Sequence, residues 1–139
     1  MPRYMLDTDT CSYVMKRSHP LLLKRLQSLS VSDVCMSVVT KAELLYGVEL
    51  SPKHAQDAAA LAAFLPYVEV LDLDEDAALH CAEIRADLKK RGAMIGANEL
   101  FIAAHARALG LTLVTNTTAE FGRVKRLALE DWTLPQRRK

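Results

Sequence analysis

The most constraining feature of this sequence is an alternation of short apolar segments with segments of helical periodicity. The apolar segments, several of them rich in β-branched residues, predict strands buried on both faces at residues 3–6, 34–39, 68–71 and 111–115. Leucine, alanine and charged residues at helical spacing lie between them. Buried strands joined by helical crossovers form a mostly parallel sheet covered on both faces. We therefore predict an α/β fold built on such a sheet.

The helical segments have recognisable ends. Ser51 followed by Pro52 predicts a helix start, and Asn98 predicts a second N-cap. Gly92 and Gly110 predict helix C-termini, because glycine is favoured just after the last helical turn. The expected helices cover residues 8–15, 22–29, 40–48, 52–65, 74–91, 98–109 and 118–124, and residues 127–132 predict a last edge strand.

The length of 139 residues predicts one domain over residues 1–139, with a frayed basic tail at 133–139. Size scaling predicts that folding buries roughly two-thirds of the surface, enough for a core without disulfides. The composition, 50% hydrophobic and 25% charged, excludes a disordered chain. The longest apolar run, residues 58–65, is too short to span a membrane, and Asp7 interrupts any signal-peptide core. We expect a soluble, cytoplasmic protein with no membrane contact.

Three cysteines bear on the compartment and on metal chemistry. Cys11, Cys35 and Cys81 are odd in number and form no CxxC pair, and the histidines fall in no zinc-ligand spacing. We therefore predict free, buried thiols in a reducing compartment rather than disulfides or a zinc site.

The charge balance limits the classes of partner. The net charge of +1 is too balanced to indicate a nucleic-acid binder by composition, since affinity for phosphates depends on clustered cations. Cations do cluster in residues 89–91, 123–126 and 137–139. We expect each cluster to be solvated surface, with the last in the tail. If several of them border one acidic pocket, they form a rim that guides phosphates.

Acidic residues follow the predicted strands at the edge where parallel sheets bind ligands. Asp7 ends the first strand, Glu43 and Glu120 lie one turn into helices that follow strands, and Glu99 opens the helix that leads into the fourth strand. Carboxylates gathered at one point repel each other unless a cation or shared protons neutralise them. Oxygen ligands without histidine or cysteine suit Mg²⁺ or Mn²⁺.

Each of these acids also has a local interpretation. Residues 40–43 and 117–120 fit capping boxes, in which the acid reaches back to the N-cap amide, and spacing alone favours this interpretation for both. Glu99 suits the positive end of a helix dipole. Asp7 could cap the helix that starts at residue 8, although it terminates a strand that should be central and buried. Asn116 either orients a ligand water or makes an Asx-turn.

Four segments carry a further pattern: MLDT at 5–8, VVTKAEL at 38–44, IGANE at 95–99 and LVTN at 113–116. In this order they resemble the motifs of PIN-domain ribonucleases, and more narrowly of the VapC toxins of bacterial toxin–antitoxin pairs. The segment LEDW at 129–132 is similar to the usual VapC ending. The resemblance covers nearly the whole chain, and four motifs in the right order are far more specific than any one of them.

The resemblance implies a three-layer α/β/α sandwich and an endoribonuclease dependent on Mg²⁺ or Mn²⁺, with structured RNA, often tRNA, as substrate. It also implies a VapB antitoxin that blocks the site, and a homodimer. The implied catalytic residues are Asp7, Glu43, Glu99 and Glu120, with Asp7, Glu99 and Glu120 as metal ligands, and Thr115 and Asn116 as flanking polar residues. Glu43, with Glu120 as the second candidate, would orient or deprotonate the attacking water.

Two residues depart from the family pattern. Asp9 stands where the family often has asparagine, and Glu99 stands where it normally has aspartate. One extra methylene displaces a carboxylate by about 1 Å, and such a displacement can lower a rate roughly a hundredfold. The alternative hypothesis is therefore an attenuated or inactive homologue that binds antitoxin or RNA without efficient cleavage.

Two other classes fit the sequence less well. A receiver-type phospho-acceptor domain needs adjacent acids after its first strand and a lysine after its last, and neither is evident. A dinucleotide-binding fold needs a glycine-rich turn after the first strand, where this chain has Asp7-Thr8-Asp9.

Overall fold

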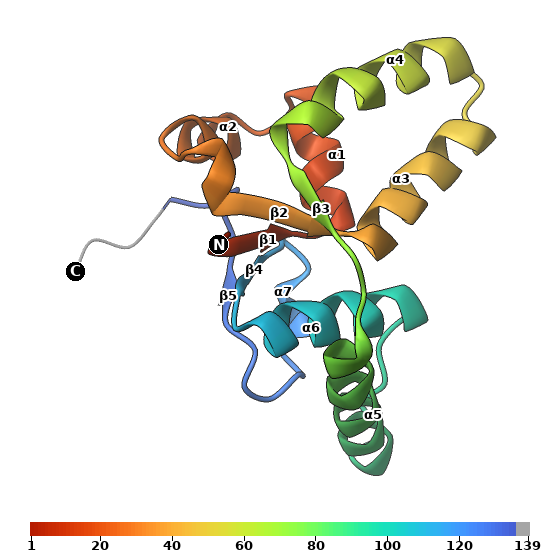
Figure 1. Ribbon diagram of the computed structural model, residues 1–139, viewed down its shortest axis with the longest axis vertical. Helices are drawn as coiled ribbons and strands as arrows, with labels where there is room; N and C mark the ends of the chain where they lie inside the picture. Colours follow the sequence, from red (N-terminus) through yellow and green to blue (C-terminus); the bar gives the residue numbers. More distant parts are fainter. Residues whose placement is uncertain (136–139) are drawn as a thin grey trace.

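The computed structural model describes residues 1–135, and in this range a five-stranded sheet forms the centre of the protein (Figure 1). The strand order is β3-β2-β1-β4-β5, and every neighbouring pair is parallel. The strands are β1 (Tyr4–Leu6), β2 (Val34–Ser37), β3 (Glu69–Leu71), β4 (Thr112–Val114) and β5 (Leu129–Glu130). The predicted parallel sheet is confirmed, and β1 lies at its middle.

Helices cover both faces of this sheet. Figure 1 shows α1, α2 and α4 on one face, α5 and α6 on the other, and α3 projecting with α4 at the side. The helices are α1 (Thr8–Lys16), α2 (Pro20–Gln27), α3 (Val38–Leu50), α4 (His54–Phe64), α5 (Glu75–Lys90), α6 (Ala97–Leu109) and α7 (Thr118–Phe121), with 3₁₀ turns at Val31–Asp33 and Leu65–Tyr67. The three-layer α/β/α sandwich is therefore confirmed.

Two apolar cores hold the layers together, because side chains of a strand alternate between its faces. Met5 belongs to the core under α5 and α6, whereas Tyr4 and Leu6 belong to the core under α1, α2 and α4. Trp132, after β5, is fully buried in the second core, and its ring meets that of Tyr4 edge-on at 5.0 Å. The packing fixes the carboxyl end of β1, where Asp7 follows.

Some predicted boundaries are wrong. The second strand ends at Ser37, because the Ser37 hydroxyl caps α3 and draws Val38 and Val39 into the helix. The helix expected from Ser51 begins at His54 instead, since Ser51 ends α3 and its hydroxyl bonds Asp57 at 2.5 Å. The helix expected to be capped by Asn98 begins at Ala97, with Gly96 as the N-cap. In all three cases the N-cap residue lies two or three positions away from the predicted one.

Three expectations concern the chain as a whole. No helix in the described range is both long and apolar enough to cross a membrane. Within the same range the three cysteines are free, with Cys11 and Cys35 buried and Cys81 half-buried. Of the predicted frayed tail, residues 133–135 are described and Thr133 bonds the Asp131 carboxylate, while residues 136–139 lie outside the described part. The division into one domain stays a prediction.

Candidate active site

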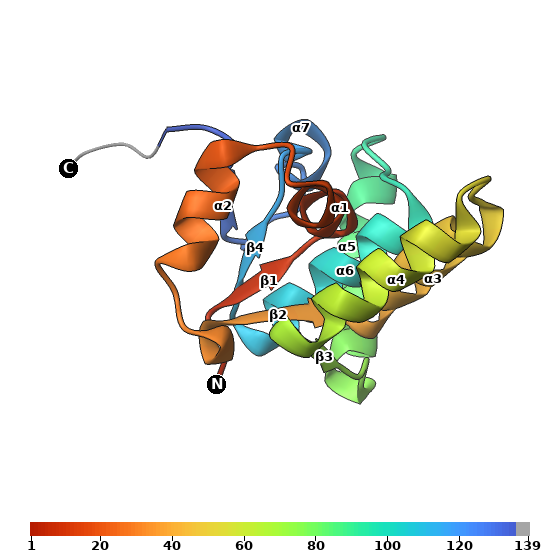
Figure 2. The same cartoon turned by 90° about the horizontal axis from the view of Figure 1, so that it is seen from above.

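The carboxyl edge of the sheet holds a cavity of about 320 Å³. Strands β1 and β2 point toward this side, where α1, α3 and α6 lie (Figure 2). Acidic side chains from four separate segments reach the cavity, which is lined by Asp7, Thr8, Asp9, Glu43, Glu99, Ile102, Thr117, Glu120 and Phe121. The tertiary structure therefore brings together the four acids that the sequence analysis selected.

Asp7 is the most deeply buried of these acids, with 3% of its surface exposed. It is the N-cap of α1, and its Oδ1 accepts a hydrogen bond of 2.8 Å from the Thr10 backbone N–H. Burial raises the pKa of Asp7, and hydrogen bonds from Thr115 and Thr10 lower it in part. The capping interpretation of Asp7 is thus correct, and the same carboxylate also lines the cavity.

Glu43 is held by two side chains from other helices. The Thr8 hydroxyl on α1 donates a short hydrogen bond to Glu43 Oε1, and Asn98 Nδ2 on α6 donates to Oε2 at 3.3 Å. The capping box expected at residues 40–43 is wrong, because α3 begins at Val38 and Glu43 lies beyond its first turn. The Glu43 carboxylate is therefore available to the cavity.

Glu99 and Glu120 both line the cavity. The pKa of Glu99 is raised to about 7, first by burial and then by the neighbouring Glu120 side chain and its charge. The capping box expected at residues 117–120 is also wrong, since no side chain in the described range caps α7. Glu120 instead serves as the partner of Glu99.

The two flanking polar residues have different positions. Thr115 is buried, lowers the pKa of Asp7 in part, and accepts the Thr117 backbone N–H at 2.9 Å. Asn116 is exposed at the surface and does not line the described cavity. Thr8 and Asn98, which hold Glu43, were missed as site residues. Their only sequence signal is that they adjoin Asp7 and Glu99.

The donor set fits a hard divalent cation, because carboxylates and threonine hydroxyls supply only oxygen. Within the described residues, no three acidic, histidine or cysteine side chains already stand together as metal ligands. Glu43 is held by Thr8 and Asn98, and Glu99 lies near enough to Glu120 for the Glu120 charge to raise its pKa.

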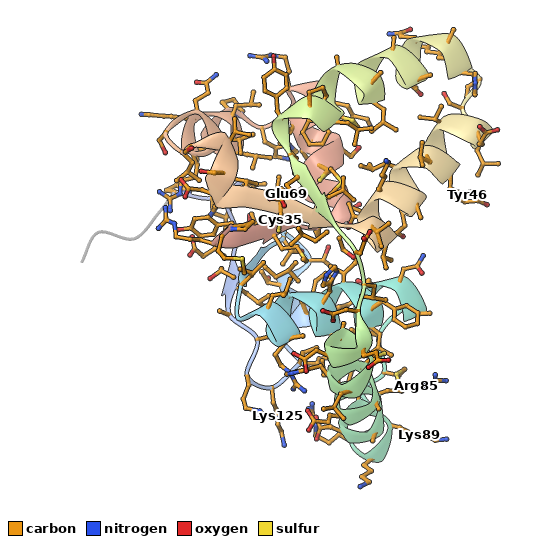
Figure 3. All side chains as sticks on the ribbon, viewed as in Figure 1. Cys35, Tyr46, Glu69, Arg85, Lys89 and Lys125 are labelled. Carbon is orange, nitrogen blue, oxygen red and sulfur yellow. The ribbon has the colours of Figure 1, made fainter. Side chains whose placement is uncertain are left out.

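The basic runs at 89–91 and 123–126 do not line this cavity, and the third run, at 137–139, lies outside the described residues. Lys125 lies 3.5 Å from Asp87, Arg126 lies 3.9 Å from Glu83, and Arg123 donates to the Met94 carbonyl at 3.1 Å. Figure 3 shows Lys125 and Lys89 around α5, on the far side of the protein from α4. These cations are thus surface residues, and the ion pairs of Lys125 and Arg126 connect the loop after α7 to α5. No phosphate-guiding rim forms among the described residues.

A parallel sheet of this order, with an acidic cavity at its carboxyl edge, defines a PIN domain, and the PIN-domain family model matches residues 4–127. The chain belongs to the PIN-domain family and, within it, to the VapC ribonucleases. It is 39% identical over 132 residues to the tRNA(fMet)-specific endonuclease VapC of Salmonella typhimurium, and 42% identical over 132 residues to Ribonuclease VapC2 of Haemophilus influenzae. In both cases the alignment covers 95% of this chain and 99% of the relative.

Solved structures give the same assignment. The DNA-bound VapBC of Salmonella typhimurium superposes with a TM-score of 0.89 and 39% identity, over 95% of this chain and 99% of that chain. VapBC2 of Rickettsia felis, bound to a DNA fragment from its promoter, gives a TM-score of 0.87 and 37% identity, over 93% and 98%. The family resemblance found in the sequence is confirmed. PIN-domain ribonucleases generally depend on a divalent metal.

Proposed function

We propose that this protein is the toxin of a VapBC-type toxin–antitoxin pair and a metal-dependent endoribonuclease. The observation that carries the proposal is the cavity at the carboxyl edge, in which Asp7, Glu43, Glu99 and Glu120 meet. These residues come from segments more than 30 positions apart, except for the last pair, which are 21 apart. Membership of the VapC ribonucleases supports the reaction class.

In this proposal Asp7, Glu99 and Glu120 hold Mg²⁺ or Mn²⁺. When bound there, such an ion would supply Lewis-acid chemistry to the phosphodiester and to the attacking water. Glu43 accepts the proton of the attacking water, because its carboxylate lines the cavity without a backbone partner of its own. Thr8 and Asn98 fix the two oxygens of Glu43. In-line attack leaves a 5′-phosphate and a 3′-hydroxyl.

The proposed substrate is a structured RNA with an unstacked strand, and tRNA is the first candidate. Two relatives, from Salmonella typhimurium and Shigella flexneri, are named tRNA(fMet)-specific endonucleases. A cavity of this size admits a phosphodiester of an exposed loop rather than a duplex. Glu99 lines the cavity beside Glu120, which favours an active enzyme over the inactive-homologue alternative.

The proposed partners are a VapB-type antitoxin and a second copy of this chain. Similar solved structures are VapBC complexes. A second cavity, of about 560 Å³, lies between α1, α3 and α4 and shares Thr8, Asp9 and Glu43 with the catalytic one. Near it α3 exposes Leu45, Tyr46 and Leu50, and Tyr46 points away from the helix into solvent (Figure 3). Such apolar exposure suits a protein interface. A cytoplasmic location stays a prediction.

The test is RNA cleavage by the wild type and by Asp7→Asn, with Mg²⁺ or with excess EDTA. Asparagine keeps the size of the side chain and an oxygen that can accept the Thr10 N–H, so the α1 cap persists while the charge is lost. We expect EDTA to abolish cleavage and Asp7→Asn to lower it by about 100-fold or more. Undiminished cleavage in either case would refute the proposal.

A further inference from the structure

The side chain of Glu99 folds back over the residue that begins its helix. Glu99 is the third residue of α6, two positions after the first residue of the helix and three after the N-cap Gly96, whose backbone lowers the pKa of the Glu99 carboxyl in part. Glu99 Oε1 lies only 2.7 Å from the point where a Cβ atom on Gly96 would stand. The carboxylate therefore occupies space that exists because residue 96 has no side chain.

The backbone does not require glycine at this position. Gly96 has φ −61° and ψ 151°, a conformation open to every residue, unlike Gly92 and Gly110 with φ of +63° and +68°. Gly122 is crowded as well, but by the Thr118 backbone carbonyl at 2.5 Å. Among the described glycines, only Gly96 would place its Cβ against the end of a flexible side chain that lines the acidic cavity.

We propose that Gly96 is a positioning residue that leaves room for glutamate at position 99, where the resemblance to VapC toxins implies aspartate. The fold-back over Gly96 takes up the extra methylene, so that the Glu99 carboxylate stays beside Glu120 in the cavity. The inference rests on the proposed function, because it concerns how Glu99 is placed to bind the cation.

The effect of a methyl group on residue 96 follows from the contact distances. A Cβ atom 2.7 Å from Glu99 Oε1 is below any tolerated contact, so one of the two groups must move. The carboxylate is the mobile end of its side chain and moves at little cost to the fold. It then leaves its present position in the cavity that Glu120 also lines.

Aspartate at position 99 would avoid this conflict. Its carboxyl carbon would stand where Glu99 has Cγ, and that atom lies 3.8 Å from the Cβ position of residue 96, an ordinary van der Waals contact. Its oxygens can then point into the cavity. Gly96→Ala should thus weaken cation binding when residue 99 is glutamate. It should leave cation binding nearly unchanged in the Glu99→Asp variant.

The experiment compares four proteins: wild type, Gly96→Ala, Glu99→Asp and the double variant. Mn²⁺ affinity is measured by electron paramagnetic resonance, and thermal unfolding is measured without metal. We expect Gly96→Ala to weaken Mn²⁺ binding roughly 10- to 100-fold in the Glu99 background, as for loss of a group that orients a metal ligand. In the Glu99→Asp background the same change should alter affinity less than about twofold. The melting temperature should stay or rise by about 2–4 °C, since the alanine is compatible with the backbone.

An equal loss of Mn²⁺ affinity in both backgrounds would overturn the inference, and so would an unchanged affinity in the Glu99 background. A crystal structure of metal-free Gly96→Ala separates this inference from the proposed function. A displaced Glu99 carboxylate supports the positioning role even if the wild type binds no Mn²⁺. A carboxylate that keeps its place beside Glu120 refutes that role even if the wild type cleaves RNA.

Discussion

Asn98 Nδ2 donates a hydrogen bond to Glu43 Oε2 over 3.3 Å, which joins the first turn of α6 to α3. Asn98 is the immediate neighbour of Glu99, so one turn of α6 both supplies an acid to the cavity and holds the acid of another helix. Thr8 bonds the other oxygen of Glu43. Together these side-chain contacts from α1 and α6 fix the position of the Glu43 carboxylate.

This arrangement predicts the outcome of changes at Glu43. Glu43→Gln keeps an oxygen for the Thr8 hydroxyl but cannot accept a proton, so we expect kcat to fall by about 10²- to 10⁴-fold. Mn²⁺ affinity should change little, because Glu43 is not among the proposed ligands. Single-turnover cleavage and Mn²⁺ titration measure the two quantities. Asn98→Ala should give a smaller loss of kcat, about tenfold, and equal losses for the two variants would contradict the assigned roles.

The raised pKa of Glu99, beside Glu120 in the cavity, predicts a pH dependence of cation binding. The pKa of Glu99 is raised to about 7, so below that pH a proton competes with the cation for this pair. Mn²⁺ affinity should therefore fall as the pH drops below about 7, approaching about tenfold per pH unit, and level off above it. Isothermal titration from about pH 5.5 to about pH 8 measures this. Glu120→Gln removes the charge that contributes to the shift, and an unaltered pH profile in that variant would argue against the pairing.

The buried carboxylate of Asp7 is expected to lower the stability of the metal-free protein, although the proposed function needs its charge. Because burial raises the pKa of Asp7, the folded state binds its proton more tightly than the unfolded state does. The ionised form thus destabilises the metal-free fold, and stability falls as the pH rises from the ordinary value through the raised one. At neutral pH Asp7→Asn should raise the melting temperature by about 2–4 °C while lowering cleavage by about 100-fold or more.

Asp7→Ala is the matched control for this prediction. It removes the charge but also the oxygen that accepts the Thr10 N–H, which costs about 1 kcal/mol for a helix cap. The alanine variant should melt below the asparagine variant in the absence of metal. If Asp7→Asn melts below the wild type at neutral pH, the desolvation account of this residue is wrong.

Ser37 links two of the helices that carry site residues. Its hydroxyl accepts the Val39 N–H at 3.1 Å as the cap of α3 and bonds His105 Nδ1 of α6 at 2.8 Å, where both residues are buried. Ser37→Ala removes the cap and leaves a buried imidazole nitrogen without this partner, so we expect a loss of about 2–3 kcal/mol in unfolding free energy.

The control for Ser37 is Ser30→Ala. Ser30 also caps a helical turn, but its bond to the Ser32 N–H is exposed and long, at 3.4 Å. Urea denaturation should therefore show a loss of about 0.5–1 kcal/mol for Ser30→Ala. Similar losses for the two variants would mean that the buried contact with His105 contributes nothing.

Much of the fold could be predicted from local patterns in the sequence. Apolar runs placed β1 and β4 within one residue, because a strand buried on both faces must be apolar throughout. β3 was placed equally well, although it is an edge strand with Glu69 exposed. The same logic placed Asp7 at the carboxyl edge, since the residue after a central strand of a parallel sheet lies there. The grouping of the four acids also followed from chain order and the family pattern.

What the sequence determined by itself was the alternation of elements, the parallel sheet and the edge at which the acids gather, because these depend on hydrophobic periodicity along the chain. Only the tertiary structure decided what each acid does there. Glu43 is held by residues 35 and 55 positions away, Glu99 is paired with Glu120, and Gly96 makes room for Glu99. Spacing favoured capping boxes for Glu43 and Glu120, because local spacing describes only neighbours along the backbone. Contacts between distant side chains arise when the helices pack against a common sheet.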